Sequence, residues 1–123
     1  MAHVTGSVNQ ELEAFVQLEF VNGRTLDCLL DTGFGGAVLL PARIVKANGF
    51  AIIGDAYFRT VGKKGETKAQ MAVAGVKWLG EEFDVPIIVS ETDFALIGVD
   101  MLVDCRLEID YVASTVVIEK IQG

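Results

Sequence analysis

The chemically suggestive part of this sequence is the triplet Asp31-Thr32-Gly33, which lies between two apolar segments. Apolar residues run from Cys28 up to the aspartate and resume at Ala37. Burying a carboxylate without a partner costs free energy, so an aspartate in a buried segment is expected to have a functional or structural role. A glycine beside it lets another chain approach closely, and a threonine hydroxyl can bond inside a tight turn. Asp31 is therefore a candidate catalytic acid or base. The alternative is a turn aspartate that only caps backbone amides.

The cysteine and histidine residues of the sequence do not indicate a metal site or a disulfide. The two cysteines, Cys28 and Cys105, lie far apart and outside any CxxC pattern. In a reducing compartment such residues are buried thiols more often than a disulfide. The one histidine, His3, lies near the terminus, so these residues lack the spacing of a zinc site. We expect no metal and no cofactor.

Composition limits the class of protein. The 123 residues are 51% hydrophobic and 22% charged, which predicts a single domain over 1–123 with its own core. The net charge of -7 argues against nucleic acid and against an anionic membrane surface as partners. No apolar run reaches the roughly 20 residues that span a bilayer. The first residues also lack the basic and apolar regions of a signal peptide, so we expect a cytoplasmic protein.

The elements that must position Asp31 are mostly strands. Short runs rich in β-branched and aromatic residues alternate along the chain, and Asn22-Gly23 is a strong hairpin signal. This pattern predicts strands at 13–21, 24–30, 37–41, 56–61, 66–76, 81–90, 106–111 and 114–121, with a short buried run at 94–98. A helix is expected at 41–49, ended by Asn48-Gly49, and about two helical turns at 99–105.

A weak internal repeat relates the two halves of the chain. In the first half, the apolar pair Leu29-Leu30 leads into Asp31 and a change of direction. In the second half, Leu96-Ile97 leads into Gly98 and a helical turn. Such a duplication suggests a fold with pseudo-two-fold symmetry.

Two stretches together, LLDTGFGGAVLLP at 29–41 and ALIGVDML at 95–102, carry a family resemblance. The chain resembles the retropepsin-like aspartic proteases, in a prokaryotic branch with the form Asp-Thr-Gly-Phe-x-Gly. The second stretch matches the family's Gly-x-Asp-x-Leu through Gly98, Asp100 and Leu102. The resemblance implies a mostly β acid-protease fold, a closed β-barrel-like single domain with one or two short helices. It also implies an aspartic endopeptidase that hydrolyses peptide bonds.

The resemblance implies how the site would be built. Aspartic protease chemistry needs two carboxylates facing one water, and the second half of this chain offers Gly98 without an acid at the related place. A homodimer that contributes Asp31 twice is therefore implied. Thr32 would bond across the dimer and hold the two loops. Gly33 would leave room for a peptide substrate and bond its backbone.

The hairpin at 58–70 occupies the position of the family's flap, which lies over an extended peptide and pairs with its backbone. Gly62 and Gly65 would give the hairpin tip its mobility. Lys63 and Lys64 would favour acidic substrate residues, or else belong to a solvated turn.

Several residues depart from the family pattern. Phe34 stands where Ala or Ser is usual, so its ring could line a pocket, pack on the partner chain or narrow the cleft. Tyr57 does not clearly match the flap tyrosine and is expected in a strand or the core, and Trp78 is expected to pack. The terminal segments 2–8 and 114–121 could interleave into a dimer sheet, although their pattern does not require it.

Two other functions remain open at this point. The same fold could serve as a dimerisation or peptide-binding module with weak hydrolysis or none. The stretch DTGFGG at 31–36 could instead be a phosphate-binding turn, as in actin-like ATPases, but those folds need a far longer chain.

Overall fold

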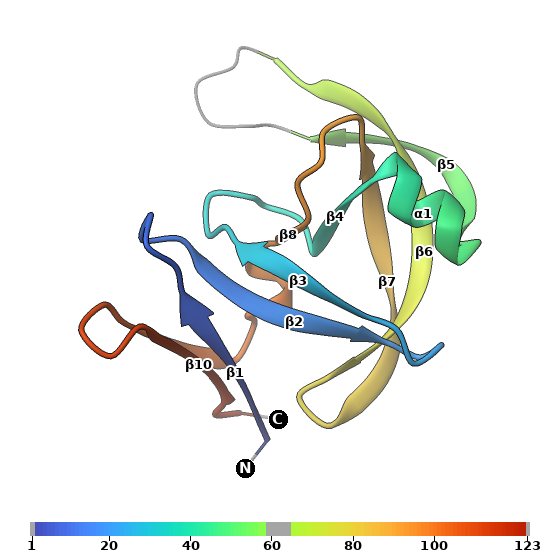
Figure 1. Ribbon diagram of the computed structural model, residues 1–123. Helices are drawn as coiled ribbons and strands as arrows, with labels where there is room; N and C mark the ends of the chain where they lie inside the picture. The colour runs from blue at the N-terminus through green and yellow to red at the C-terminus, as the bar shows by residue number, and fades with distance from the viewer. Residues whose placement is uncertain (1, 59–64, 123) are drawn as a thin grey trace.

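The computed structural model describes residues 2–58 and 65–122 and is built mostly of strands (Figure 1). The strands in these residues are β1 (His3–Val8), β2 (Ala14–Phe20), β3 (Thr25–Leu30), β4 (Val38–Pro41), β5 (Ala51–Phe58), β6 (Thr67–Trp78), β7 (Glu81–Ser90), β8 (Leu96–Ile97), β9 (Cys105–Asp110) and β10 (Thr115–Lys120). One α-helix, α1 (Ala42–Asn48), and one 3-10 turn, η1 (Val99–Met101), complete the described part. No helix there is long and apolar enough to cross a membrane.

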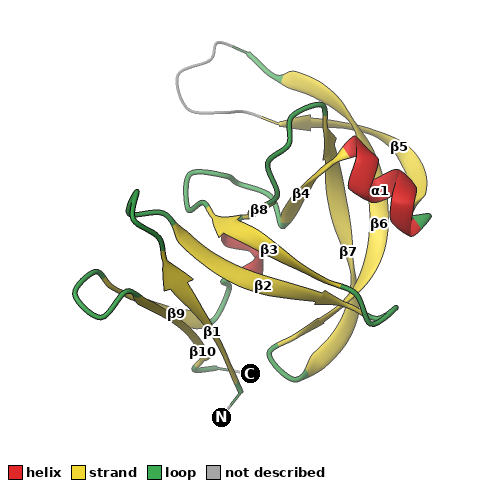
Figure 2. Ribbon diagram, in the orientation of Figure 1, coloured by secondary structure: helices red, strands yellow, loops and turns green. Residues whose placement is uncertain are grey.

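The strands form a sheet that closes on itself. Its order is β5-β6-β7-β4-β8-β3-β2-β1-β10-β9, and an additional pairing joins β2 to β6. That pairing, Glu19 with Lys77 and Phe20 with Val76, closes a ring through β7, β4, β8 and β3 (Figure 2). Closure satisfies edge groups that an open sheet would expose. The expectation of a mostly β, barrel-like fold is confirmed.

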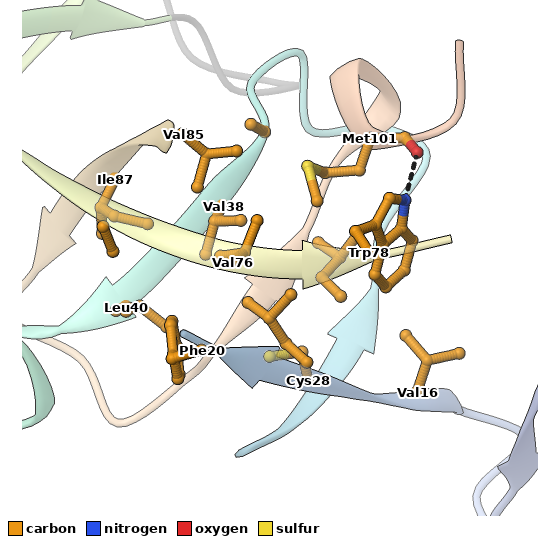
Figure 3. Packing of buried hydrophobic residues seen from close by; sticks show 14 of the residues in the cluster. Val16, Phe20, Cys28, Val38, Leu40, Val76, Trp78, Val85, Ile87 and Met101 are labelled. Atoms are coloured by element: carbon orange, nitrogen blue, oxygen red, sulfur yellow. Dashed lines mark hydrogen bonds between the residues drawn. The ribbon is translucent and has the colours of Figure 1, made fainter. Parts of the chain in front are cut away.

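The core lies inside this ring. On β2 the buried side chains alternate with more exposed ones, as a strand with one face inward requires. The fully buried side chains include Leu18, Phe20, Val38, Ile87 and Ile97, and Figure 3 shows part of this cluster. Trp78 packs there as expected, and its indole N–H donates a 3.0 Å hydrogen bond to the carbonyl of Met101. This bond gives a hydrogen-bond partner to the only polar atom of the buried indole ring.

Most of the predicted elements are present, with two differences. Helix α1 ends where expected, because Gly49 adopts a left-handed φ of 66° and donates to the carbonyl of Lys46. Strand β5 starts at Ala51, well before the predicted residue 56. A bulge between Ile52 and Gly54 breaks the alternation of its side chains, so the sequence pattern does not show the first part of the strand. In the segment 99–105 only Val99–Met101 is helical, as the single turn η1, and β9 begins at its last residue, Cys105.

The chain ends pair with each other inside one chain. Strand β1 pairs with β10 from His3–Glu119 to Ser7–Thr115, and it also pairs with β2. Strand β10 pairs with β9 on its other side. Both terminal strands therefore have neighbours on both edges, and the two ends lie close together in Figure 1. Interleaving these strands with a second chain would require breaking existing pairs.

Candidate active site

Asp31 lies where β3 ends, and its place is set by the parallel neighbour β8. Leu29 pairs with Leu96 and Leu30 pairs with Ile97, so the two apolar runs of the internal repeat lie side by side. The backbone N–H of Asp31 donates to the carbonyl of Ile97 at 2.9 Å. This register puts Asp31 next to Gly98, so the corresponding position of the second half carries no acid.

The loop at 31–37 is tied to the chain after β8 by main-chain hydrogen bonds. Gly98 donates to the carbonyl of Ala37 at 2.9 Å, and Val99 donates to that of Phe34 at 3.1 Å. Asp100 donates to the carbonyl of Gly36 at 3.2 Å. These bonds join two segments that are distant in sequence, and they fix the backbone that carries Asp31.

The Asp31 carboxylate is oriented by its own loop. Its Oδ1 accepts a 2.9 Å hydrogen bond from the backbone N–H of Gly33. Asp31 is half-buried, whereas Thr32 and Gly33 are exposed. The Thr32 hydroxyl makes no hydrogen bond with any residue in the described ranges. The triplet therefore presents an oriented carboxylate and an unused hydroxyl to the outside of the molecule.

Phe34 does not take any of the three positions considered for it. Its side chain is 5% exposed and lies inside its own chain, against Gly36 and Gly98. A Cβ added to Gly36 would lie 2.7 Å from the ring Cζ. A Cβ added to Gly98 would lie 2.6 Å from the ring Cδ2 and 2.2 Å from the carbonyl oxygen of Gly36. The ring thus fills the inside of the Asp31 loop, and both glycines make room for it.

A cleft of about 710 Å³ is lined by Asp31 at one place and by the loop end of β6, Thr67 to Ala69, at another. Its apolar lining comes from Leu29, Leu39, Ala69, Ile88, Val89, Phe94 and Leu96, and its polar lining includes Glu13, Lys68 and Glu91. Phe94 is the clearest residue that sequence reasoning missed, since its ring is 61% exposed beside the cleft. Phe94 stands at the start of the run at 94–98, which was interpreted only as buried.

The predicted flap lies only partly within the described residues. Gly62, Lys63 and Lys64 fall outside them. Gly65 is exposed with a φ of 75°, as a turn glycine requires. The strands that lead to it pair from Ala51–Val73 to Phe58–Thr67, and the loop end of β6, Thr67 to Ala69, lines the cleft.

Neither metal binding nor thiol chemistry is evident. Within 2–58 and 65–122, no group of three or more His, Cys, Asp or Glu residues could hold a metal ion. Cys28 and Cys105 are both free thiols. Burial, with a smaller effect from the negative charge of Asp27, raises the pKa of Cys28 to about 12. Cys28 is therefore a protonated, inert thiol of the core.

The solved structures most informative for this geometry are proteases. No protein-family model matches the chain, and no curated protein matches it. A retropepsin-like aspartic protease from Rickettsia conorii is similar over 94% of this chain and 89% of its own, with a TM-score of 0.65 and 18% identity. EIAV protease bound to an inhibitor is similar over 80% of this chain and 92% of its own, with a TM-score of 0.56 and 20% identity. The foamy viral protease-reverse transcriptase is similar over 70% of this chain but only 11% of its own, with a TM-score of 0.51 and 20% identity. The fold of this chain is retropepsin-like.

Proposed function

We propose that this protein is an aspartic endopeptidase whose active site forms between two copies of the chain. Structural neighbours with the same fold are an aspartic protease and a viral protease, which supports a protease-like function. The observation that carries the finer proposal is the β3–β8 register, which places one carboxylate, Asp31, beside Gly98 at the mouth of an apolar cleft. A two-carboxylate site then requires a second chain.

The proposed chemistry uses the two Asp31 carboxylates as one unit. At a separation of about 3 Å they share one proton, because two adjacent negative charges repel strongly. The ionised Asp31 takes a proton from a water molecule as the water oxygen attacks the peptide carbonyl carbon. The protonated Asp31 of the partner subunit donates to the developing oxyanion. The carbon–nitrogen bond then breaks as the leaving nitrogen takes a proton from the pair and a hydroxyl of the intermediate returns one to it. The products are an amine and a carboxylic acid, and the pair again holds one proton.

The neighbouring residues position this unit. The Gly33 N–H holds Asp31 Oδ1 at 2.9 Å, so the carboxylate does not rotate freely. The exposed Thr32 hydroxyl is available to bond across the dimer, which would fix the two loops against each other. Gly33 itself is exposed, so its backbone is open to an extended peptide. Effective acid–base catalysis depends on such fixed geometry.

The substrate is proposed to be a peptide or unfolded protein segment lying in the cleft. Seven apolar side chains, including Ala69, line the cleft around Asp31, so burial of apolar substrate side chains would supply binding free energy. The peptide backbone would pair with the β5–β6 hairpin as an added strand. No cofactor takes part in this chemistry.

We also propose that residues 1–123 act as one domain, since one sheet and one core cluster connect the described ranges. A cytoplasmic location remains a prediction, supported by the two free cysteines.

The test is the substitution Asp31→Asn, which keeps the shape and removes the charge. Cleavage of an unfolded protein substrate, measured from about pH 3 to pH 8, should fall by at least roughly 100-fold at every pH. The dimer, measured by light scattering, should persist. Asp27→Asn is the matched control, because Asp27 is an exposed carboxylate on the same strand. Absence of wild-type cleavage over the whole range would refute the enzyme and leave the dimerisation or peptide-binding module.

A further inference from the structure

Two turns of the molecule expose apolar side chains. The turn at 9–13 joins β1 to β2 and exposes 65% of Leu12. The turn at 110–114 joins β9 to β10 and exposes 56% of Tyr111 and 97% of Val112. Single exposed apolar residues are normal on proteins, but neighbouring ones mark an interaction surface. Leu12, Tyr111 and Val112 are called the turn surface below.

The two turns are neighbours, and the turn at 9–13 lies beside the Asp31 loop. The backbone N–H of Val8 donates to the carbonyl of Ser114 at 3.1 Å, which joins the bases of the two turns. Phe15 pairs with Leu29 in the β2–β3 ladder, and both strands run on from this pair toward 13 and 31. Glu13 and Asp31 accordingly line the same cleft. Figure 1 shows the turns at 9–13 and 110–114 and the loop at 31–37 on the same side of the molecule.

Both turns are held in one conformation by side-chain hydrogen bonds. Asn9 Oδ1 accepts from the backbone N–H groups of Glu11 at 3.0 Å and Glu13 at 2.9 Å. Leu12 is thereby held at a φ of 63°, a left-handed conformation that leucine rarely adopts. Asp110 Oδ1 accepts from Val112 and Ala113, both at 2.9 Å. Groups that are already ordered lose little conformational entropy when a partner covers them.

The requirement for a second Asp31 identifies the partner. If two copies bring their Asp31 side chains together about a two-fold axis, each copy must cover the surface beside its partner's Asp31 loop. The terminal strands already pair within their own chain on both edges. A chain with a net charge of -7 also repels its copy, so the contact needs apolar groups to offset the repulsion.

We propose that the turn surface is where the second copy of this chain binds. The inference rests on the proposed function, because it follows from the need to complete the active site. It goes beyond that function by assigning the dimer contact to Leu12, Tyr111 and Val112 rather than to interleaved chain ends. Each copy contributes the same residues to an isologous contact.

The experiment compares Leu12→Glu and Val112→Glu with wild type by sedimentation equilibrium at micromolar concentrations. A buried charge at this contact should weaken self-association by at least about tenfold, while circular dichroism stays that of the wild type. Cleavage per chain should fall in parallel and recover as the protein concentration rises. Ile53→Glu is the matched control, since Ile53 is 56% exposed on β5 and should leave association unchanged.

The outcomes separate this inference from the proposed function. A wild-type monomer at every concentration, or variants that associate as wild type does, would overturn the turn surface as the contact. If Ile53→Glu weakened self-association as much as the turn variants do, the turn surface would be overturned as the contact as well, because the effect would then come from the added charge alone. If the turn variants dissociate and wild type cleaves nothing, the turn surface stands and the endopeptidase proposal falls.

Discussion

Removing the ring of Phe34 and adding a methyl group at Gly36 should have coupled effects on stability. The Phe34 ring lies against Gly36, where an added Cβ would be 2.7 Å from Cζ and 3.0 Å from Cε1. All three nearest atoms that this Cβ would meet belong to the ring. Gly36→Ala is therefore resisted by one side chain alone, and removing that side chain should relieve the strain.

The sizes of the effects follow from burial. Phe34→Ala removes a ring that is 5% exposed, so we expect a loss of about 3–5 kcal/mol in the free energy of unfolding. Gly36→Ala overpacks the loop in the wild-type background, at a cost of about 1–3 kcal/mol. Independent effects would add to about 4–8 kcal/mol. In the double variant the new methyl enters the space left by the ring, so the total should equal the Phe34→Ala loss or fall below it.

The assay is urea unfolding of the four proteins at one fixed protein concentration, because association adds to apparent stability. Gly35→Ala serves as the control, since a Cβ on Gly35 would meet nothing within 4 Å. It should change the free energy of unfolding by less than about 0.5 kcal/mol. If Gly36→Ala costs the same with and without the Phe34 ring, the ring does not lie on Gly36 and our account of this loop is wrong.

Two further variants test the remaining buried groups. Gly98→Ala places a Cβ 2.2 Å from the Gly36 carbonyl oxygen, which cannot rotate away, so we expect a loss of about 3 kcal/mol or more and reduced cleavage, measured by urea unfolding and substrate hydrolysis. Burial raises the pKa of the Cys28 thiol from an ordinary 9.0 to about 12, so the thiol keeps its proton in the folded state. Its contribution to stability is therefore complete below pH 9 and is lost as pH rises toward 12. From pH 8 to pH 10 wild type should lose about 1.4 kcal/mol more than Cys28→Ala, and equal losses in urea unfolding at the two pH values would contradict this.

The sequence predicted most of the strands because local pattern determines them, whereas their closure into a ring was implied by the family resemblance. On β2 the apolar residues Ala14, Val16, Leu18 and Phe20 recur at every second position, and these are its buried side chains. The internal repeat also predicted that the apolar runs before Asp31 and Gly98 correspond, and in the structure they pair in parallel. In these segments each residue's type agrees with its burial, so pattern and structure coincide.

Other features depend on contacts between distant residues, which pattern does not contain. Phe34 was expected to line a pocket, pack on the partner chain or narrow the cleft, because the sequence pattern does not show that the β3–β8 pairing brings Gly98 beside it. The start of β5 was missed because the bulge at 52–54 interrupts the alternation that marks a strand. Phe94 was assigned to a buried run because the cleft it lines exists only after β7 and β8 are in place.

The same contacts explain why this chain needs a partner to build a two-carboxylate site. The position beside Asp31 in the β3–β8 pairing is Gly98, and its Cβ would lie 2.2 Å from one carbonyl oxygen and 2.6 Å from another. No side chain fits there, so an acid at this position is sterically excluded. The Phe34 ring packs inside the loop that fixes Asp31. It fits there because Gly36 and Gly98 have no side chains. The close packing that holds the first carboxylate therefore excludes a second one at this place, and a site of the proposed kind must take it from another copy.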